Sequence, residues 1–203
     1  MLFLSFWRFG FFTSPFVIDF LCALRYHIKK HEKGEWVMSK AKKTAFLGIC
    51  VALSMMLSYI DSQIPLFPSL PGIRLGLANT VTVFFIYKIS SAKAAYVTFI
   101  RVALCGILFY GNAYHIAYGL CGAMLSILVM LLLKRTGAFS ITGVSIAGGV
   151  SHNIGQILCA VAMTMTPQII LYLPPLLICG CLCGAGIGAV SALLIRRIEK
   201  GRR

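Results

Sequence analysis

Long apolar runs separated by short polar breaks dominate the chain from residue 38 onward. Each run is close to the roughly 20 residues that an α-helix needs to cross a bilayer. Proline, glycine and small polar residues interrupt the pattern between the runs, as expected where spanning helices end. The pattern therefore predicts an all-α membrane protein with six transmembrane helices, at residues 44–61, 74–90, 92–111, 113–133, 140–166 and 168–195.

Composition agrees with a membrane protein and argues against a soluble nucleic-acid binder. Of the 203 residues, 59% are hydrophobic and 12% are charged, and 19 Lys and Arg against 5 Asp and Glu give a net charge of +14. A soluble domain usually carries about 25% charged residues. The basic residues here lie in short clusters between apolar runs, so the positive charge indicates membrane topology, and we expect contact with the lipid bilayer but no nucleic-acid partner.

The positions of lysine and arginine predict how the chain is oriented. Cytoplasmic loops of membrane proteins carry an excess of these residues. If Met38 is cytoplasmic, the outer side receives Arg74 alone, and Arg101 falls within the third span. The inner side then receives Lys40, Lys42, Lys43, Lys88, Lys93, Lys134, Arg135, Arg196, Arg197, Lys200, Arg202 and Arg203. We therefore expect a multi-pass protein of the bacterial cytoplasmic (inner) membrane with both termini in the cytoplasm.

The first 37 residues differ from the rest of the chain. They combine an apolar, aromatic start with Arg8 and Pro15 and end in a polar run, which is not a clean signal-peptide pattern. The string MSKAKK from Met38 is typical of the start of a bacterial inner-membrane protein, and residues 33–37 can be encoded by a purine-rich ribosome-binding sequence. We expect an N-terminal extension at 1–37, either a mis-assigned start or an extra anchor helix, followed by a six-helix transmembrane domain at 38–203.

Ionisable side chains at membrane depth indicate a binding site. Such groups are costly in a bilayer and usually face a protein interior or a water-filled cavity. Two arginines, Arg74 and Arg101, accompany a single carboxylate, Asp61, in the outer half and middle of the spans. A guanidinium keeps its proton and matches a carboxylate or phosphate, so a small anionic or polar solute, bound from the outer side, is expected. The alternative is that Arg101 snorkels or bonds to backbone carbonyls.

Uncharged polar residues complete the candidate site. His152 and Gln156 share a helix face at i, i+4, and Asn153 is adjacent to Gln156 at i, i+3. Such side chains either line a ligand or join helices by hydrogen bonds, and an outer tyrosine such as Tyr172 either contacts the ligand or belongs to an interfacial aromatic belt. The candidate substrate-binding residues are Asp61, Arg74, Asn79, Arg101, Asn112, His152, Asn153, Gln156 and Tyr172.

Small residues predict where helices approach one another closely. The last two spans carry Gly143, Gly148, Gly149, Gly180, Gly184, Gly186, Gly188 and Ala189. A second ridge of small residues begins at the predicted cytoplasmic edge of the first span and is a candidate partner-docking surface: Ala41, Ala45, Gly48 and Ala52.

The sequence argues against catalysis by this chain. The five carboxylates do not cluster within a span, as paired magnesium ions or a two-carboxylate hydrolase site would require. The eight cysteines form no zinc-type CxxC pair, and those inside apolar runs, such as Cys121 and Cys159, are expected to act as small hydrophobes. There is no GxxxxGK[ST] motif, so any use of ATP would need another chain. We expect no enzyme activity, catalytic residue, metal or cofactor.

Three strings resemble the bacterial Gx transporter family, whose members are also labelled heptaprenyl diphosphate synthase component I. They are PGIRLGLAN at residues 71–79, SHNIGQ at 151–156 and YLPP at 172–175. The resemblance covers residues 38–203. This family is similar in turn to the substrate-binding S components of energy-coupling-factor transporters.

The resemblance implies an S-component-like bundle that holds a vitamin-like small molecule near its outer face. In S components a small-residue ridge on the first helix docks onto a transmembrane T subunit driven by ATPase subunits, and the outer loop, here residues 63–72, caps the ligand. The leading hypothesis is therefore a substrate-binding subunit of an importer. The alternatives are a non-catalytic membrane component that recruits a soluble synthase for isoprenoid synthesis, and a standalone channel or facilitator.

Overall fold

Helices account for all the regular structure that the computed structural model describes, which covers residues 40–63, 78–110 and 113–200. The α-helices are α3 (Lys40–Gln63), α4 (Asn79–Lys88), α5 (Ser91–Cys105), α6 (Ala113–Thr136), α7 (Ile141–Thr164) and α8 (Leu173–Lys200). A π-helical turn, η1 (Gly106–Tyr110), follows α5, and a 3-10 turn, η2 (Pro167–Tyr172), precedes α8. No strand occurs within these residues, and the prediction of an all-α protein is confirmed.

Five of the described helical segments are long and apolar enough to cross a membrane. They are Thr44–Asp61, Ser91–Phe109, Ile116–Thr136, Ile141–Thr164 and Pro167–Arg197. Each agrees with a predicted span to within a few residues. The sixth predicted span, 74–90, contains α4, and its first residues lie outside the described part of the chain. The chain is therefore a multi-pass membrane protein, as its hydrophobic pattern predicts.

The chain divides into two compact units, residues 1–41 and 42–203. The expectations for the extension at 1–37 and for the outer loop at 63–72 fall largely on residues that the structure does not describe, and they stay predictions.

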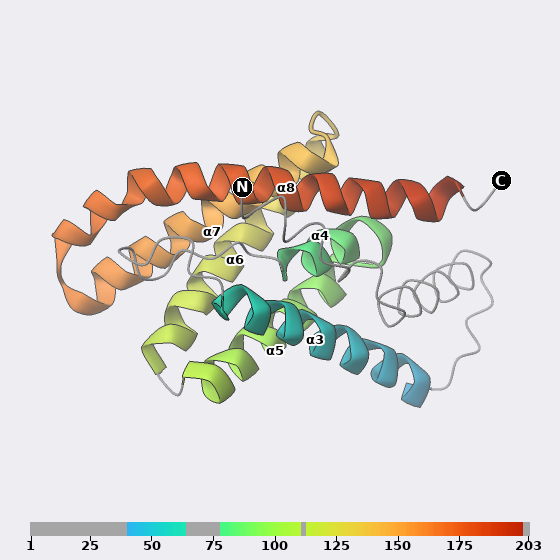
Figure 1. The fold of residues 1–203 in the computed structure, drawn as a ribbon, viewed down its shortest axis with the longest axis horizontal. Helices are drawn as coiled ribbons and strands as arrows, with labels where there is room; N and C mark the ends of the chain where they lie inside the picture. Colours follow the sequence, from blue (N-terminus) through green and yellow to red (C-terminus); the bar gives the residue numbers. More distant parts are fainter. Residues whose placement is uncertain (1–39, 64–77, 111–112, 201–203) are drawn as a thin grey trace. The chain divides into compact units, whose positions relative to one another are not determined.

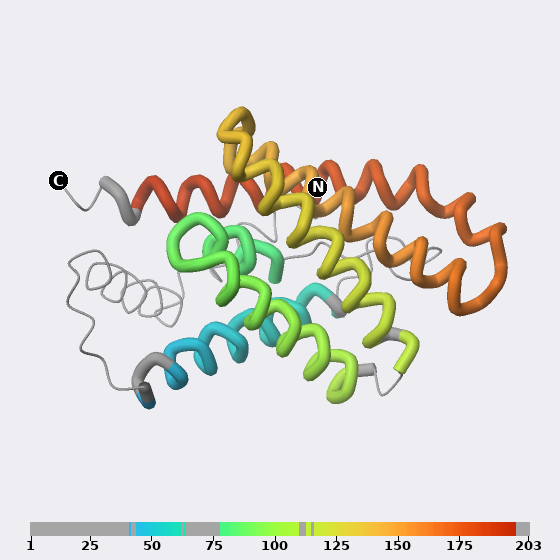
Figure 2. The backbone as a smooth tube through the Cα atoms, turned by 180° about the vertical axis from the view of Figure 1, so that it is seen from behind, coloured from blue at the N-terminus to red at the C-terminus, as the bar shows by residue number. Residues whose placement is uncertain are grey.

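Helix α7 runs between α6 and α8 and contacts both along its length (Figures 1 and 2). On the α8 side, a Cβ atom added to Gly184 would lie 2.7 Å from the Ile146 Cα, and one added to Gly188 would lie 2.7 Å from the Thr142 Cα. Real side chains do not approach a backbone so closely, so the glycines allow the two helices to touch. The predicted close approach is confirmed for Gly148, Gly149, Gly180, Gly184 and Gly188. A Cβ on Gly186 would meet nothing within 4 Å, one on Gly143 would meet only Phe139 and Ser140 beside its own helix, and Ala189 is exposed.

The opposite side of α7 meets α6 in a similar way. A Cβ on Gly155 would lie 2.9 Å from the Cys121 carbonyl oxygen, and one on Gly148 would lie 2.6 Å from the Met130 Sδ. Across the same interface the Ser126 hydroxyl donates a hydrogen bond of 2.8 Å to the Gly148 carbonyl. This bond satisfies a buried hydroxyl that would otherwise be costly in an apolar interior. Helix α7 is therefore held closely on two sides.

Helix α4 is largely enclosed by its neighbours. It packs against α5 and α8, and its residues 81–86 are all buried. A helix that is apolar all round suits such a position. The Thr82 and Thr98 hydroxyls lie 2.9 Å apart in a buried hydrogen bond that joins α4 to α5. The bond pairs two polar groups inside an otherwise apolar contact.

Lys134 fastens the last turn of α6 to the end of α4. Its Nζ donates a hydrogen bond to the Ile86 carbonyl and lies 5.2 Å from the centroid of the Tyr87 ring. A cation at this position also complements the negative end of the α4 dipole. We expect Lys134→Met to lower the free energy of unfolding by about 1–2 kcal/mol, because a charge-assisted hydrogen bond and a cation–π contact are lost while apolar packing is kept.

Thermal or denaturant unfolding of the purified protein in detergent measures this loss. Arg135→Met is the matched control, because Arg135 is the next residue of the same helix and is exposed. An equal decrease in the two variants would show that the contacts of Lys134 with α4 are not the cause.

Candidate functional site

Arg101 is buried near the middle of a membrane-spanning helix. It lies in the segment Ser91–Phe109, and its side chain is only 9% exposed. Its Nη1 donates a hydrogen bond of 3.0 Å to the Ser58 hydroxyl on α3. This burial differs from snorkelling, in which the charged head extends to water. The positive charge is held inside the bundle instead.

The inner face of α3 places polar groups beside this arginine. Ser54, Ser58 and Asp61 are 1%, 7% and 4% exposed, and their spacing of four and three residues puts them on one helix face. Asp61 also lies within electrostatic range of the Cys183 thiol on α8. The end of α3 and the middle of α5 thus bury two groups of opposite charge, Asp61 and Arg101.

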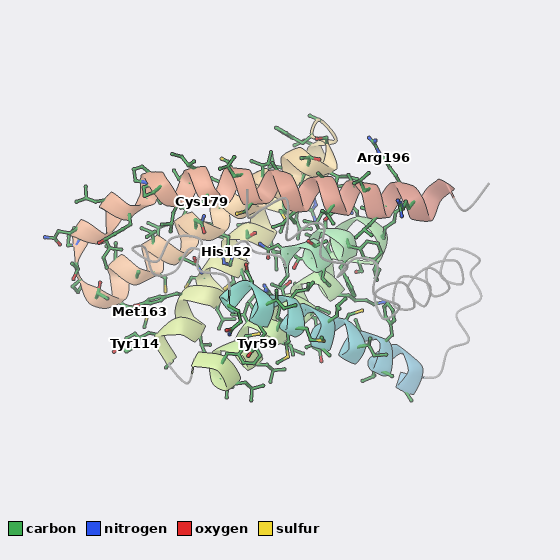
Figure 3. All side chains as sticks on the ribbon, viewed as in Figure 1. Tyr59, Tyr114, His152, Met163, Cys179 and Arg196 are labelled. Carbon is green, nitrogen blue, oxygen red and sulfur yellow. The ribbon has the colours of Figure 1, made fainter. Side chains whose placement is uncertain are left out.

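His152, labelled in Figure 3, and Gln156 both lie against Gly122 of α6. A Cβ added to Gly122 of α6 would lie 3.0 Å from the His152 Cε1 and 2.8 Å from the Gln156 Cγ. The common face predicted from their i, i+4 spacing is therefore confirmed. Gly122 gives these two half-buried side chains the room that any larger residue would fill.

Asn153 points the other way and joins α7 to α8. Its Nδ2 donates a hydrogen bond of 2.7 Å to the Leu176 carbonyl. A Cβ on Gly180 would lie 2.8 Å from the same nitrogen, so the amide is packed tightly against α8. The amide nitrogen of Asn153 therefore forms a hydrogen bond between helices. The sequence left this role open as the alternative to ligand binding.

The remaining candidates are placed less centrally. Asn79 is half-buried at the first residue of α4, and Tyr172 is 49% exposed at the last residue of η2. Arg74 and Asn112 lie outside the described residues. Ser58 is not among the predicted site residues, because a serine in an apolar helix is ordinary. Its spacing of three residues from Asp61, which puts both side chains on one helix face, is the sequence feature that could have identified it.

The groups gathered here suit recognition of a polar or anionic solute. A guanidinium binds a carboxylate or phosphate through paired hydrogen bonds, and neighbouring hydroxyl, amide and imidazole groups can fix the orientation of the solute. No three His, Cys, Asp or Glu side chains are grouped as metal ligands in the part of the chain that the structure describes.

The ridge of small residues on α3 is exposed throughout. Ala41, Ala45, Gly48 and Ala52 all lie on the surface, and a Cβ on Gly48 would meet nothing within 4 Å. The ridge occupies a different face of the helix from Ser54, Ser58 and Asp61. Helix α3 therefore presents a polar face to the bundle and a smooth face outward.

Comparison with known proteins assigns the chain to a family. A family model described as heptaprenyl diphosphate synthase component I matches residues 50–194. No curated protein and no solved structure matches the chain. The matched region contains Ser58, Asp61 and Arg101 as well as His152 and Gln156. Because the match covers more than half of the sequence, the chain belongs to the heptaprenyl diphosphate synthase component I family.

Proposed function

We propose that this protein is the integral membrane substrate-binding subunit of an importer of the energy-coupling-factor type, and that it binds a small anionic or polar solute from the outer side. The buried guanidinium of Arg101, near the middle of a spanning helix, is the observation that carries this proposal. A charge at that depth is costly, and most such charges serve binding or transport. Ser58 accepts a hydrogen bond from one of the five N–H groups of the guanidinium. The planar, forked arrangement of these groups suits a carboxylate or phosphate on the solute.

The other polar residues of the site would complete recognition. His152 and Gln156 share one face of α7, and Asp61 lies one turn beyond Ser58 on α3. We further propose that Arg74, Asn79, Asn112, Asn153 and Tyr172 contribute from the predicted outer side. In this scheme the chain binds and releases its solute without changing it chemically.

Docking to a transmembrane T subunit would use the exposed ridge of α3. Ala41, Ala45, Gly48 and Ala52 form a smooth surface on which another helix can pack closely. With both termini in the cytoplasm of a bacterial cell, the ridge begins at the cytoplasmic edge of the membrane. ATPase subunits attached to the T subunit would lie on that same side.

The family description favours a second candidate function. The chain would then be a non-catalytic membrane component associated with heptaprenyl diphosphate synthesis, with a soluble synthase as its partner. Its five carboxylates do not form the aspartate-rich clusters that hold magnesium and diphosphate. Recruitment of the synthase to the membrane, rather than catalysis, would be its contribution.

Native mass spectrometry of the full chain, purified in mild detergent from its native host, separates the two candidates. A retained small molecule that is displaced on unfolding supports the importer subunit and gives the mass of the solute. A protein that carries no small molecule but co-purifies with a synthase polypeptide supports the second candidate and contradicts the first. Solute uptake by liposomes that contain this chain alone, without nucleotide, would contradict both and indicate a facilitator.

A further inference from the structure

Three sulfur-containing side chains come together on α6 and α7, near the helix ends opposite the loop that connects them. They are Cys121 of α6 and Cys159 and Met163 of α7. The Cys159 thiol lies 3.8 Å from the Met163 sulfur. The Cys121 thiol on α6 lies close enough to Cys159 for the two thiols to interact electrostatically. Both cysteines are free thiols. Figure 3 shows Met163 towards the C-terminal end of α7.

The backbone contact between the two helices explains why these side chains meet. Gly155 packs directly on the Cys121 carbonyl, where an added Cβ would lie only 2.9 Å away. Cys159 and Met163 continue the Gly155 face of α7 at intervals of four residues. Helical side chains also lean towards the N-terminus of their helix, which carries the Cys159 thiol back towards the level of Cys121.

The cluster lies on the surface of the α6–α7 pair rather than in its core. Cys121 is exposed, Cys159 is half-buried and Met163 is 45% exposed. A thiol that only fills space in a core is normally buried. The three side chains are therefore not enclosed by other helices of the described chain, and Met163 lies at the end of its spanning segment, Ile141–Thr164.

We propose that Cys121, Cys159 and Met163 form a binding site for Cu(I). Thiolate and thioether sulfurs are the ligands that this soft ion prefers. Metal–sulfur bonds of about 2.3 Å hold two sulfurs of one metal about 3.8–4.0 Å apart. The separation of 3.8 Å between the Cys159 and Met163 sulfurs already matches that requirement.

Binding would release protons without any transfer of electrons. Cu(I) replaces the protons of the two thiols, which pass to water, and the thioether of Met163 donates a lone pair. Copper keeps its oxidation state throughout. The affinity should therefore rise with pH, by about tenfold per pH unit for each proton released.

Met165 is a further exposed methionine at the end of α7. It follows the last residue of α7, Thr164, and its side chain is 84% exposed. Its φ of 52° lies in the left-handed region, where glycine or asparagine usually ends a helix. The methionine at this position places another soft sulfur ligand at the end of α7, two residues along the chain from Met163.

Competition with a chromophoric Cu(I) chelator, under anaerobic conditions and in detergent, tests the site on the full chain. Wild-type protein should withdraw one equivalent of Cu(I). The double variant Cys121→Ser with Cys159→Ser should lose at least about 100-fold in affinity, and Met163→Leu about tenfold, because each removes direct ligands. None of these residues belongs to the proposed solute site, so the result does not depend on the importer proposal.

The double variant Cys179→Ser with Cys183→Ser is the matched control. It removes two other thiols, which lie four residues apart on α8, and it should keep the wild-type affinity. Circular dichroism checks that every variant folds. The proposal is wrong if wild-type protein yields Cu(I) to the chelator as readily as the Cys121, Cys159 variant does. It is also wrong if X-ray absorption of the copper-loaded protein lacks sulfur scattering at about 2.3 Å.

Discussion

Replacing Arg101 by alanine should lower the affinity for the solute identified by native mass spectrometry at least about 30-fold. Truncating one member of a buried, hydrogen-bonded charge pair costs about 2–5 kcal/mol, and each 1.4 kcal/mol is a factor of about ten. The Arg101 side chain is 9% exposed and already fixed by its bond to Ser58, so little ordering cost opposes binding. Calorimetric titration of the purified protein with that solute measures the loss.

Two further variants separate recognition from folding. Arg101→Lys keeps the positive charge but loses the planar fork, so its affinity should fall between those of the wild type and Arg101→Ala. Thr98→Ala is the matched control, because Thr98 is buried on the same helix and hydrogen-bonded to Thr82. It should lower thermal stability while leaving solute affinity unchanged. Wild-type affinity in Arg101→Ala, or an equal loss in Thr98→Ala, would contradict a direct role of the guanidinium.

Replacing Gly184 by alanine should destabilise the protein by about 1–3 kcal/mol, the usual cost of overpacking a close contact. The added methyl group would meet the Ile146 Cα at 2.7 Å and the Ser145 carbonyl oxygen at 3.0 Å. Both are backbone atoms, which cannot rotate away as the end of a flexible side chain can. Helices α7 and α8 would have to move apart. The cost of this movement should exceed the gain from the general preference of helices for alanine over glycine.

Gly186→Ala provides a control of opposite sign on the same helix. A Cβ at Gly186 would meet nothing within 4 Å, so the substitution keeps the helix-propensity gain of up to about 1 kcal/mol without a clash. Thermal unfolding in detergent should therefore shift downward for Gly184→Ala and slightly upward for Gly186→Ala. Equal shifts of one sign would mean that close contact between α7 and α8 is not what Gly184 provides.

The sequence by itself determined the helical segments and the family. A spanning segment must satisfy its backbone hydrogen bonds internally and needs about 20 apolar residues, and both requirements are local. For this reason the predicted spans at 113–133 and 140–166 agree closely with α6 and α7. Sequence strings also carried the resemblance that the family match supports.

The tertiary structure alone decided which face of each helix is inside. A membrane helix is apolar on its lipid side as well as its packed side, so hydrophobic periodicity does not mark the inner face as it does in a soluble protein. The neighbours His152 and Asn153 therefore turn to different helices, α6 and α8. Arg101 likewise finds its partner, Ser58, 43 residues away, because contacts between spans depend on how the helices pack and not on any spacing along the chain.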